Sequence, residues 1–502
     1  MLFPVAPQPG VFRQATEYQD GGQFSALGST PPRWWDASLT RFYGDQLGPV
    51  GGFRPRSSHA VTGRARTILP WITNTGARWL GVGTHSGLFV QDASGVVSDI
   101  TPVGFIAGQE DETANVGFGV GPFGAGAFGT ARPDTGLVTE ALVWDLDTWA
   151  DKLVGCAFSD GRIVQWDLNA AHKATAITNA PIGCLGAFVA EQGFLFAVAP
   201  GGARRTLQWS DQGDNTLWTP STTNQAGQID LVSPGSIKEG RRFGSIVFVL
   251  TDMDAHVGEY VGLPSVWSFA RVGTGCGAVS RGCIIEAGQQ LVWWGHSGFW
   301  LYNGQVQAVP CDVWDFLKQN VNLNQRSKIS GFHNSQFGEC WWFYPSAGAT
   351  ENDAYVYWDY RRNHWNIGLL ARLCAAEVDI FKYPLALGAD GLVYEHEVGD
   401  GYGGAIPFAE TGPIELGGGD QAMNCFGVIA DERIAGQVTL DFRLKPYPNG
   451  SETILAETTL TSAGRADLRF SARQAKMRIT GAAAADWRFG KARLELRPGG
   501  RR

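Results

Sequence analysis

Short runs of apolar and aromatic residues, separated by glycine-containing turns, recur along most of the chain. Four segments place such a turn between two runs: 77–95, 152–170, 290–305 and 383–399, with His-Ser-Gly, Ser-Asp-Gly, His-Ser-Gly and Ala-Asp-Gly at their centres. Because glycine adopts the positive φ that matches the twist of paired strands, these centres are typical of β-hairpin turns. The pattern predicts antiparallel hairpins that recur every several dozen residues.

Further strand candidates at 244–253, 339–347 and 353–368 fill the intervals between these hairpins. Recurring hairpins with inward aromatic side chains are typical of β-propeller blades, whose radial packing buries the faces of each sheet. The spacing is uneven, so residues 59–400 are predicted to form an irregular propeller with long loops. Segment 311–322 is the one predicted helix, with four apolar residues on one face: Val313, Phe316, Leu317 and Val321.

The two ends of the chain differ from the middle in composition and in the pattern of apolar residues. Residues 1–58 are rich in proline, paired glycines and aromatic residues, which predicts an extended arm or platform that packs on the rest of the chain or on a neighbouring subunit. Residues 401–502 contain several short runs with period-two alternation, which predicts a C-terminal β-sandwich. The predicted fold class is therefore all-β.

Composition agrees with a β-rich protein, since the chain has 67 Gly, 28 Phe and 19 Trp but only 18% charged residues. The N-terminal residues do not resemble a signal peptide, and no apolar stretch reaches the ~18 residues of a spanning helix. The eight cysteines contain no Cys-x-x-Cys pair, so we expect reduced, mostly buried thiols in a protein made in a cytoplasm.

Charge is unevenly distributed along the chain. Residues 67–464 hold 22 Lys and Arg against 41 Asp and Glu, whereas residues 465–502 hold 11 against three. An acidic middle disfavours a conventional DNA-gripping surface there. The basic C-terminal cluster is either a solvated strand face or a surface that docks on an acidic protein or on nucleic-acid phosphates, with these candidate residues: Arg473, Arg478, Arg488, Arg493 and Arg497.

The glycine-rich segment 117–129 contains two overlapping Gly-x-Gly-x-x-Gly patterns. A dinucleotide site needs that pattern between a strand and a helix, and no helix is predicted to follow it here. The segment is better interpreted as a loop. Its regularly spaced aromatic residues Phe118, Phe123 and Phe128 are predicted to touch a partner or to line a channel.

Signatures of catalysis are weak. The chain has no His-Glu-x-x-His, Gly-x-Ser-x-Gly or P-loop pattern, and segment 395–397 (Glu-His-Glu) alternates between two strand faces. The pairs Asp145/Asp147 and Asp252/Asp254 each share a strand face, as many surface pairs do. Segment 210–218 resembles the Asp-box turn of sialidase-like propellers, which is structural. The sequence predicts no enzyme activity, no cofactor and no metal site.

The segment from Phe12 to Pro55 resembles the opening of tail hub, or nozzle, proteins of short-tailed bacteriophages, also called packaged-DNA stabilisation proteins. Arg41-Phe42, Gly44, Leu47 and Gly51-Gly52-Phe53 match the family's pattern. Segments 207–231 and 410–420, and the ending at 493–500, are also similar to it. The matches run through the chain in order, and their motifs are structural rather than catalytic.

The resemblance implies a homo-oligomeric ring, expected to be a hexamer, beneath the portal and adaptor ring of a virion tail. Such a ring retains packaged double-stranded DNA, conducts it at ejection, and carries tail fibre, spike or needle proteins. We therefore expect a virion protein made in the host cytoplasm and without a membrane partner. Two alternatives remain open at this point: a propeller-type carbohydrate-binding or glycan-degrading tail protein, and a monomeric propeller scaffold for protein partners.

Overall fold

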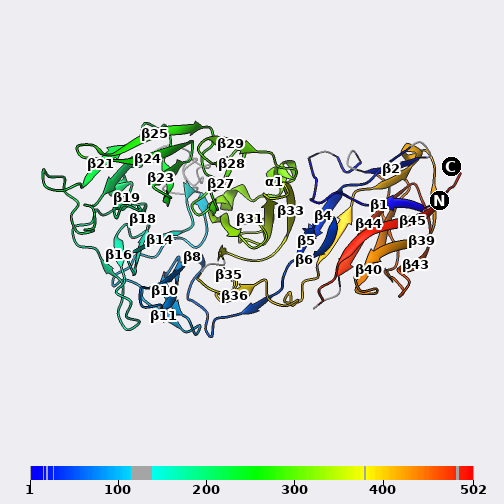
Figure 1. The fold of residues 1–502 in the computed structure, drawn as a ribbon, viewed down its shortest axis with the longest axis horizontal. Coiled ribbons are helices and arrows are strands. Elements are labelled where there is room, and N and C mark those ends of the chain that lie inside the picture. Colours follow the sequence, from blue (N-terminus) through cyan, green and yellow to red (C-terminus); the bar gives the residue numbers. More distant parts are fainter. Residues whose placement is uncertain are drawn as a thin grey trace, which may run out of the picture.

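The computed structural model describes residues 2–14, 16–18, 21–25, 28–114, 138–377, 380–481 and 485–500. Nearly all of their regular structure is β-strand, which confirms the all-β prediction (Figure 1). The predicted helix is present as α1 (Trp314–Asn320), and Val313, Leu317 and Val321 are buried beside it. No helix in these ranges is both long and apolar enough to cross a membrane.

Six four-stranded antiparallel sheets are each built from four consecutive strands and are called blades 1 to 6. Blade 1 comprises β8 (Ala65–Ile72), β9 (Arg78–Thr84), β10 (Gly87–Asp92) and β11 (Val97–Asp99). Blade 2 comprises β14 (Trp144–Trp149), β15 (Lys152–Ala157), β16 (Ile163–Gln165) and β17 (Thr175–Ala176). Blade 3 comprises β18 (Gly186–Val189), β19 (Leu195–Val198), β20 (Thr206–Trp209) and β21 (Gly227–Asp230). Blade 4 comprises β22 (Ile237–Phe243), β23 (Ile246–Thr251), β24 (Asp254–Gly262) and β25 (Val266–Thr274). Blade 5 comprises β26 (Ile284–Ala287), β27 (Gln290–Gly295), β28 (Gly298–Tyr302) and β29 (Val306–Val309). Blade 6 comprises β30 (Ser330–Asn334), β31 (Glu339–Tyr344), β32 (Ala354–Asp359) and β33 (His364–Leu369).

A seventh sheet joins distant parts of the chain. Its strands β34 (Cys374–Ala376), β35 (Leu385–Leu387) and β36 (Val393–His396) are completed by β7 (Phe53–Pro55), which comes from the N-terminal region. The first strands of the blades lie next to one another around a circle, and the contact between β34 and β8 closes it. The described residues therefore form a seven-bladed β-propeller, and the predicted propeller fold is confirmed.

The four predicted hairpins are the middle hairpins of four blades. β9 and β10, β15 and β16, β27 and β28, and β35 and β36 pair directly across the predicted turns. Gly161 and Gly391 adopt φ values of +69° and +79° in two of these turns, as the hairpin geometry requires. The blade cores are aromatic, and Phe299 packs on Trp342 and Trp365 with centroid distances of 4.7 and 4.5 Å.

The remaining strands form two sheets that pack as a β-sandwich beside the propeller (Figure 1). One sheet contains β1 (Leu2–Val5), β5 (Thr40–Tyr43), β6 (Gln46–Pro49), β39 (Met423–Glu432), β43 (Arg465–Ala472) and β45 (Phe489–Pro498). The other contains β2 (Gly22–Ser25), β3 (Gly28–Thr30), β4 (Trp34–Ser38), β37 (Phe408–Thr411), β38 (Ile414–Leu416), β40 (Val438–Lys445), β41 (Thr453–Ile454), β42 (Thr458–Thr459) and β44 (Gln474–Gly481). N-terminal strands thus pair with C-terminal strands, so the strands between Leu2 and Pro49 pack on the rest of the chain.

Period-two alternation explains the sandwich strands, since β43 alternates strictly between exposed and buried residues. Figure 1 shows β1, β39, β43 and β45 at the end of the molecule remote from the propeller, with β4, β5 and β6 at the junction. Arg41 of β5 occupies that junction, donating to Glu339 of β31 at 2.5 and 2.8 Å and to Glu397 at 2.7 and 3.1 Å. The guanidinium also lies 3.6 Å from the ring centroid of Phe337. This buried triad couples the sandwich to blades 6 and 7.

Candidate functional site

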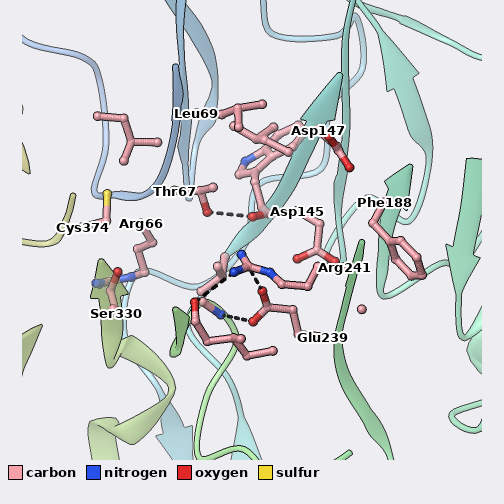
Figure 2. Close-up of a pocket in the computed structure, with 18 of the residues that line it drawn as sticks. Arg66, Thr67, Leu69, Asp145, Asp147, Phe188, Glu239, Arg241, Ser330 and Cys374 are labelled. Carbon is pink, nitrogen blue, oxygen red and sulfur yellow. Dashed lines mark hydrogen bonds and ion pairs between the residues drawn. The ribbon is translucent and has the colours of Figure 1, made fainter. Parts of the chain in front are cut away.

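The first strands of the seven blades enclose a cavity of about 330 Å³ on the propeller axis. Figure 2 shows charged side chains from two blades converging on it, among them Asp145, Glu239 and Arg241. Phe188, Ser330 and Cys374 complete parts of its wall. A central cavity lined by convergent polar groups is the usual position for a ligand in a protein of this shape.

Asp145 and Asp147 both lie on β14 and face the open edge of β18. The Asp147 carboxylate accepts the Val189 N–H at 2.8 Å, and Asp145 accepts the Ala187 N–H. The Asp145 side chain is only 13% exposed, and its Oδ2 lies 4.0 Å from the nearest Arg281 nitrogen. That oxygen has no hydrogen-bond partner among the described residues. Burial raises the pKa of Asp145 to about 7; Arg281 opposes the shift and Glu239 adds to it.

Glu239 and Arg241 of β22 form another part of the cavity wall. Glu239 accepts the Gly282 N–H at 2.7 Å and lies 3.3 Å from Arg241, whose guanidinium donates to the Ile284 carbonyl at 3.2 Å. Asp145 is therefore half-protonated near neutral pH while Glu239 lies in the same polar cavity. A carboxyl group with a pKa near neutrality can act as a general acid or base if a substrate lies within hydrogen-bond distance of it.

The described residues of the connection between blades 1 and 2 contact segments beside the innermost strands. Its short strands β12 (Thr113–Ala114) and β13 (Val138–Thr139) pair with each other. Glu112 accepts the Ser327 N–H at 2.9 Å, and Glu140 forms ion pairs with Lys238 and Arg281. The connection is thus fixed to blade 4 and to the segments before blades 5 and 6, beside the innermost strands.

From the sequence, Asp145 and Asp147 are interpreted as a surface pair. In the structure both residues line the propeller channel. Their shared strand face is visible in the sequence. What the sequence does not reveal is that β14 is the innermost strand of its blade. The second pair differs again, because Asp254 is buried and accepts hydrogen bonds from Ser233 and Thr251.

The predicted site residues lie in several places. Phe118, Phe123 and Phe128 lie outside the described residues. Arg478 stacks on Phe408 at 3.6 Å and lies 3.5 Å from Glu410, on the nine-stranded sheet. Arg488 stacks on Tyr43 at 3.7 Å and pairs with Asp486. Arg473 is half-buried, and only Arg493 and Arg497 lie exposed together on one strand, β45.

Other kinds of site find little support in the described part of the chain. No group of three His, Cys, Asp or Glu side chains within it could hold a metal ion. All eight cysteines are buried, as the sequence predicts, and burial raises the pKa of Cys283 and Cys425 to about 11. Thiols with raised pKa values carry little thiolate at neutral pH, so these two are poor nucleophiles.

No protein-family model matches this chain, and no curated protein sequence matches it. Solved structures similar to it include a streptogramin B lyase (9% identity, 68% of this chain, 96% of that chain, TM-score 0.37) and BamB from Moraxella catarrhalis (10%, 71%, 95%, 0.37). The WD40 domain of Pan2 from Neurospora crassa is similar at 7% identity, over 68% of this chain and 94% of that chain, with a TM-score of 0.36. Similarity at this level says nothing of function, and the propeller is identified from its seven sheets.

Proposed function

We propose that this protein is a structural component of a virion tail, a tail hub or nozzle subunit, rather than an enzyme. One observation carries the proposal: the residues that match the family pattern lie where the propeller and the sandwich join. Arg41 binds Glu339 and Glu397, and Gly51 donates its N–H to Glu397 at 2.9 Å. A rigid joint between two bodies is what a load-transmitting subunit needs.

Close packing around the same residues supports this interpretation. A Cβ added to Gly51 would lie 2.5 Å from the Glu397 Cα, and one added to Gly52 would lie 2.5 Å from the Gly401 backbone nitrogen. Phe53, next in the chain, packs against His396 and Tyr402 with centroid distances of 5.3 and 6.3 Å. The Gly-Gly-aromatic unit thus fits a site where two chain segments cross with no room for side chains.

In this proposal the subunit forms a ring, a hexamer by the resemblance, that binds the adaptor and portal and carries fibre, spike or needle proteins. Residues 53–400, which contain the propeller, hold 23 Lys and Arg against 33 Asp and Glu. A surface of like charge lets the phosphate backbone pass without sticking. The propeller therefore suits the conducting part of such a channel.

The test is the mass and shape of the purified protein, by light scattering with negative-stain imaging. We expect closed rings near six times 54.1 kDa, either alone or after mixing with the adaptor ring. A closed ring requires heterologous contacts between identical subunits. A protein that stays monomeric in both conditions would contradict the proposal and favour a monomeric scaffold.

The channel cavity favours a second candidate, a glycan-binding or glycan-degrading tail protein. Its specific support is Asp145, whose pKa of about 7 would allow it to donate a proton beside the carboxylate of Glu239. We expect a screen of glycan turnover to detect activity if this candidate is right, and Asp145→Asn to abolish it. Turnover that persists in Asp145→Asn would exclude this cavity as the active site.

A further inference from the structure

The outer face of the six-stranded sheet carries a group of exposed cations. β43 and β45 flank β39, and the residues that point outward from them include Arg465, Arg469, Lys491, Arg493 and Arg497. The strand register aligns them in rows, because Arg465 and Arg493 both lie opposite Ile429. We call these five residues the basic face.

Most of the basic face has no internal counter-charge. Arg465 lies 3.3 Å from Asp467 and 3.7 Å from Glu495, and the exposed Asp431 of β39 is a third acidic residue on the same face. The other four cations make no ion pair with any residue that the structure describes. Arg497 instead lies 4.9 Å from the ring centroid of Phe426, which is 37% exposed. With five cations against three carboxylates, the face presents a net positive charge to solvent.

The composition of the basic face distinguishes between kinds of partner. Protein interfaces have a core depleted of charge and anchored by apolar or aromatic side chains, whereas most of the exposed side chains on this face are charged. Single-stranded nucleic acid is held by several stacking aromatics, but Phe426 is the one exposed aromatic on the described part of this face, and Arg497 covers it. Guanidinium groups bind phosphate oxygens in a bidentate manner.

We propose that the basic face binds the sugar–phosphate backbone of double-stranded DNA without reading its sequence. Residues four apart on a strand are separated by about 13 Å, and strands two apart by about 10 Å. Arg465, Arg469, Arg493 and Arg497 thus form a flat array that can contact several phosphates at once. The proposal deepens the tail-hub proposal and rests on it for the source of the duplex. It adds a holding surface at the end of the subunit remote from the acidic propeller.

The test is fluorescence anisotropy of a labelled 30-base-pair duplex, titrated with the full-length protein at 50 to 200 mM salt. Three to four phosphate contacts predict that affinity falls by about 40- to 150-fold across that range. The triple variant Arg469→Gln, Arg493→Gln, Arg497→Gln is expected to lose most of this salt dependence, each substitution lowering the slope by about one. All three side chains are exposed, so the fold should survive.

A matched control changes the net charge equally with exposed residues of the propeller: Arg78→Gln, Arg204→Gln, Arg271→Gln. It is expected to bind the duplex like the unmodified protein. Three results would each overturn the proposal. The first is an equal loss of duplex affinity in both triple variants, and the second is the absence of salt-dependent binding. The third is tighter binding to a 30-nucleotide single strand or to polyglutamate than to the duplex. Light scattering on the same samples separates the two proposals. A ring that does not bind DNA contradicts only the proposal for the basic face, whereas a monomer that binds DNA contradicts only the tail-hub proposal.

Discussion

Replacing Arg41 by alanine is expected to lower the free energy of unfolding by about 3–5 kcal/mol, the cost of removing one partner from a buried ion pair. The Arg41 side chain is 2% exposed and that of Glu339 is 1% exposed. Burial alone raises the pKa of both glutamates, but the Arg41 charge reverses this for Glu397, whose pKa lies below its ordinary value. Without Arg41, two buried carboxylates remain uncompensated. Chemical denaturation at pH 7, followed by tryptophan fluorescence, measures the loss.

The pH dependence of the Arg41→Ala defect gives a further check. Protonating Glu339 and Glu397 removes the uncompensated charge, so the deficit should shrink as the pH falls from 7 to 5. Arg54→Ala is the matched control, since the Arg54 side chain is 59% exposed and its ion pair with Glu395 should contribute less than about 1 kcal/mol. A loss no larger for Arg41→Ala than for Arg54→Ala would show that the triad does not join the two bodies.

The Asp145→Asn variant is expected to be more stable than the unmodified protein by about 2 kcal/mol at pH 8 and equal to it at pH 4. The pKa of Asp145 is raised from 3.8 to about 7 in the folded protein, so the folded state binds more protons than the unfolded state between these values. The contribution of Asp145 to stability is therefore complete below about pH 4 and is lost as the pH rises to 7. Three pKa units correspond to at most about 4 kcal/mol. The amide replaces an oxygen without a hydrogen-bond partner, which reduces the gain.

Denaturation midpoints at several pH values measure this effect. In the unmodified protein, Asp145 should contribute a decline in stability between pH 4 and 7 that Asp145→Asn removes. Asp315→Asn is the control, because the Asp315 side chain is 49% exposed beside Lys318 and should leave the pH profile unchanged. Parallel pH profiles for Asp145→Asn and the unmodified protein would show that Asp145 titrates normally and would weaken the glycan-site candidate with it.

Local pattern predicts the parts of the fold that depend on neighbouring residues. The hairpins of blades 1, 2, 5 and 7 follow from their turn residues, and β43 follows from strict alternation. The helix face of α1 follows from the spacing of Val313, Leu317 and Val321. These features need only a few residues of context, so composition and periodicity suffice to find them.

Long-range pairings are beyond such reasoning. β7 pairs with β36, which follows it by more than 300 residues, and Arg41 meets Glu339 and Glu397 across a similar separation. No local propensity encodes those partners. The candidate sites divide in the same way: β45 explains why Arg493 and Arg497 share a face, whereas the position of Asp145 on the propeller axis requires knowledge of which strand is innermost in its blade.

The pairing of first strands with last strands has a consequence for biosynthesis. A ribosome releases β1 to β6 long before it makes β37 to β45, with which these strands pair. The nascent chain therefore carries apolar strand edges through most of translation, when they are open to aggregation and to chaperone binding. The strands of the propeller end at His396, but the sandwich cannot be completed until the last hundred residues have emerged. Ribosomal stalling or termination after blade 7 should therefore yield a propeller whose N-terminal strands lack their partners and promote aggregation.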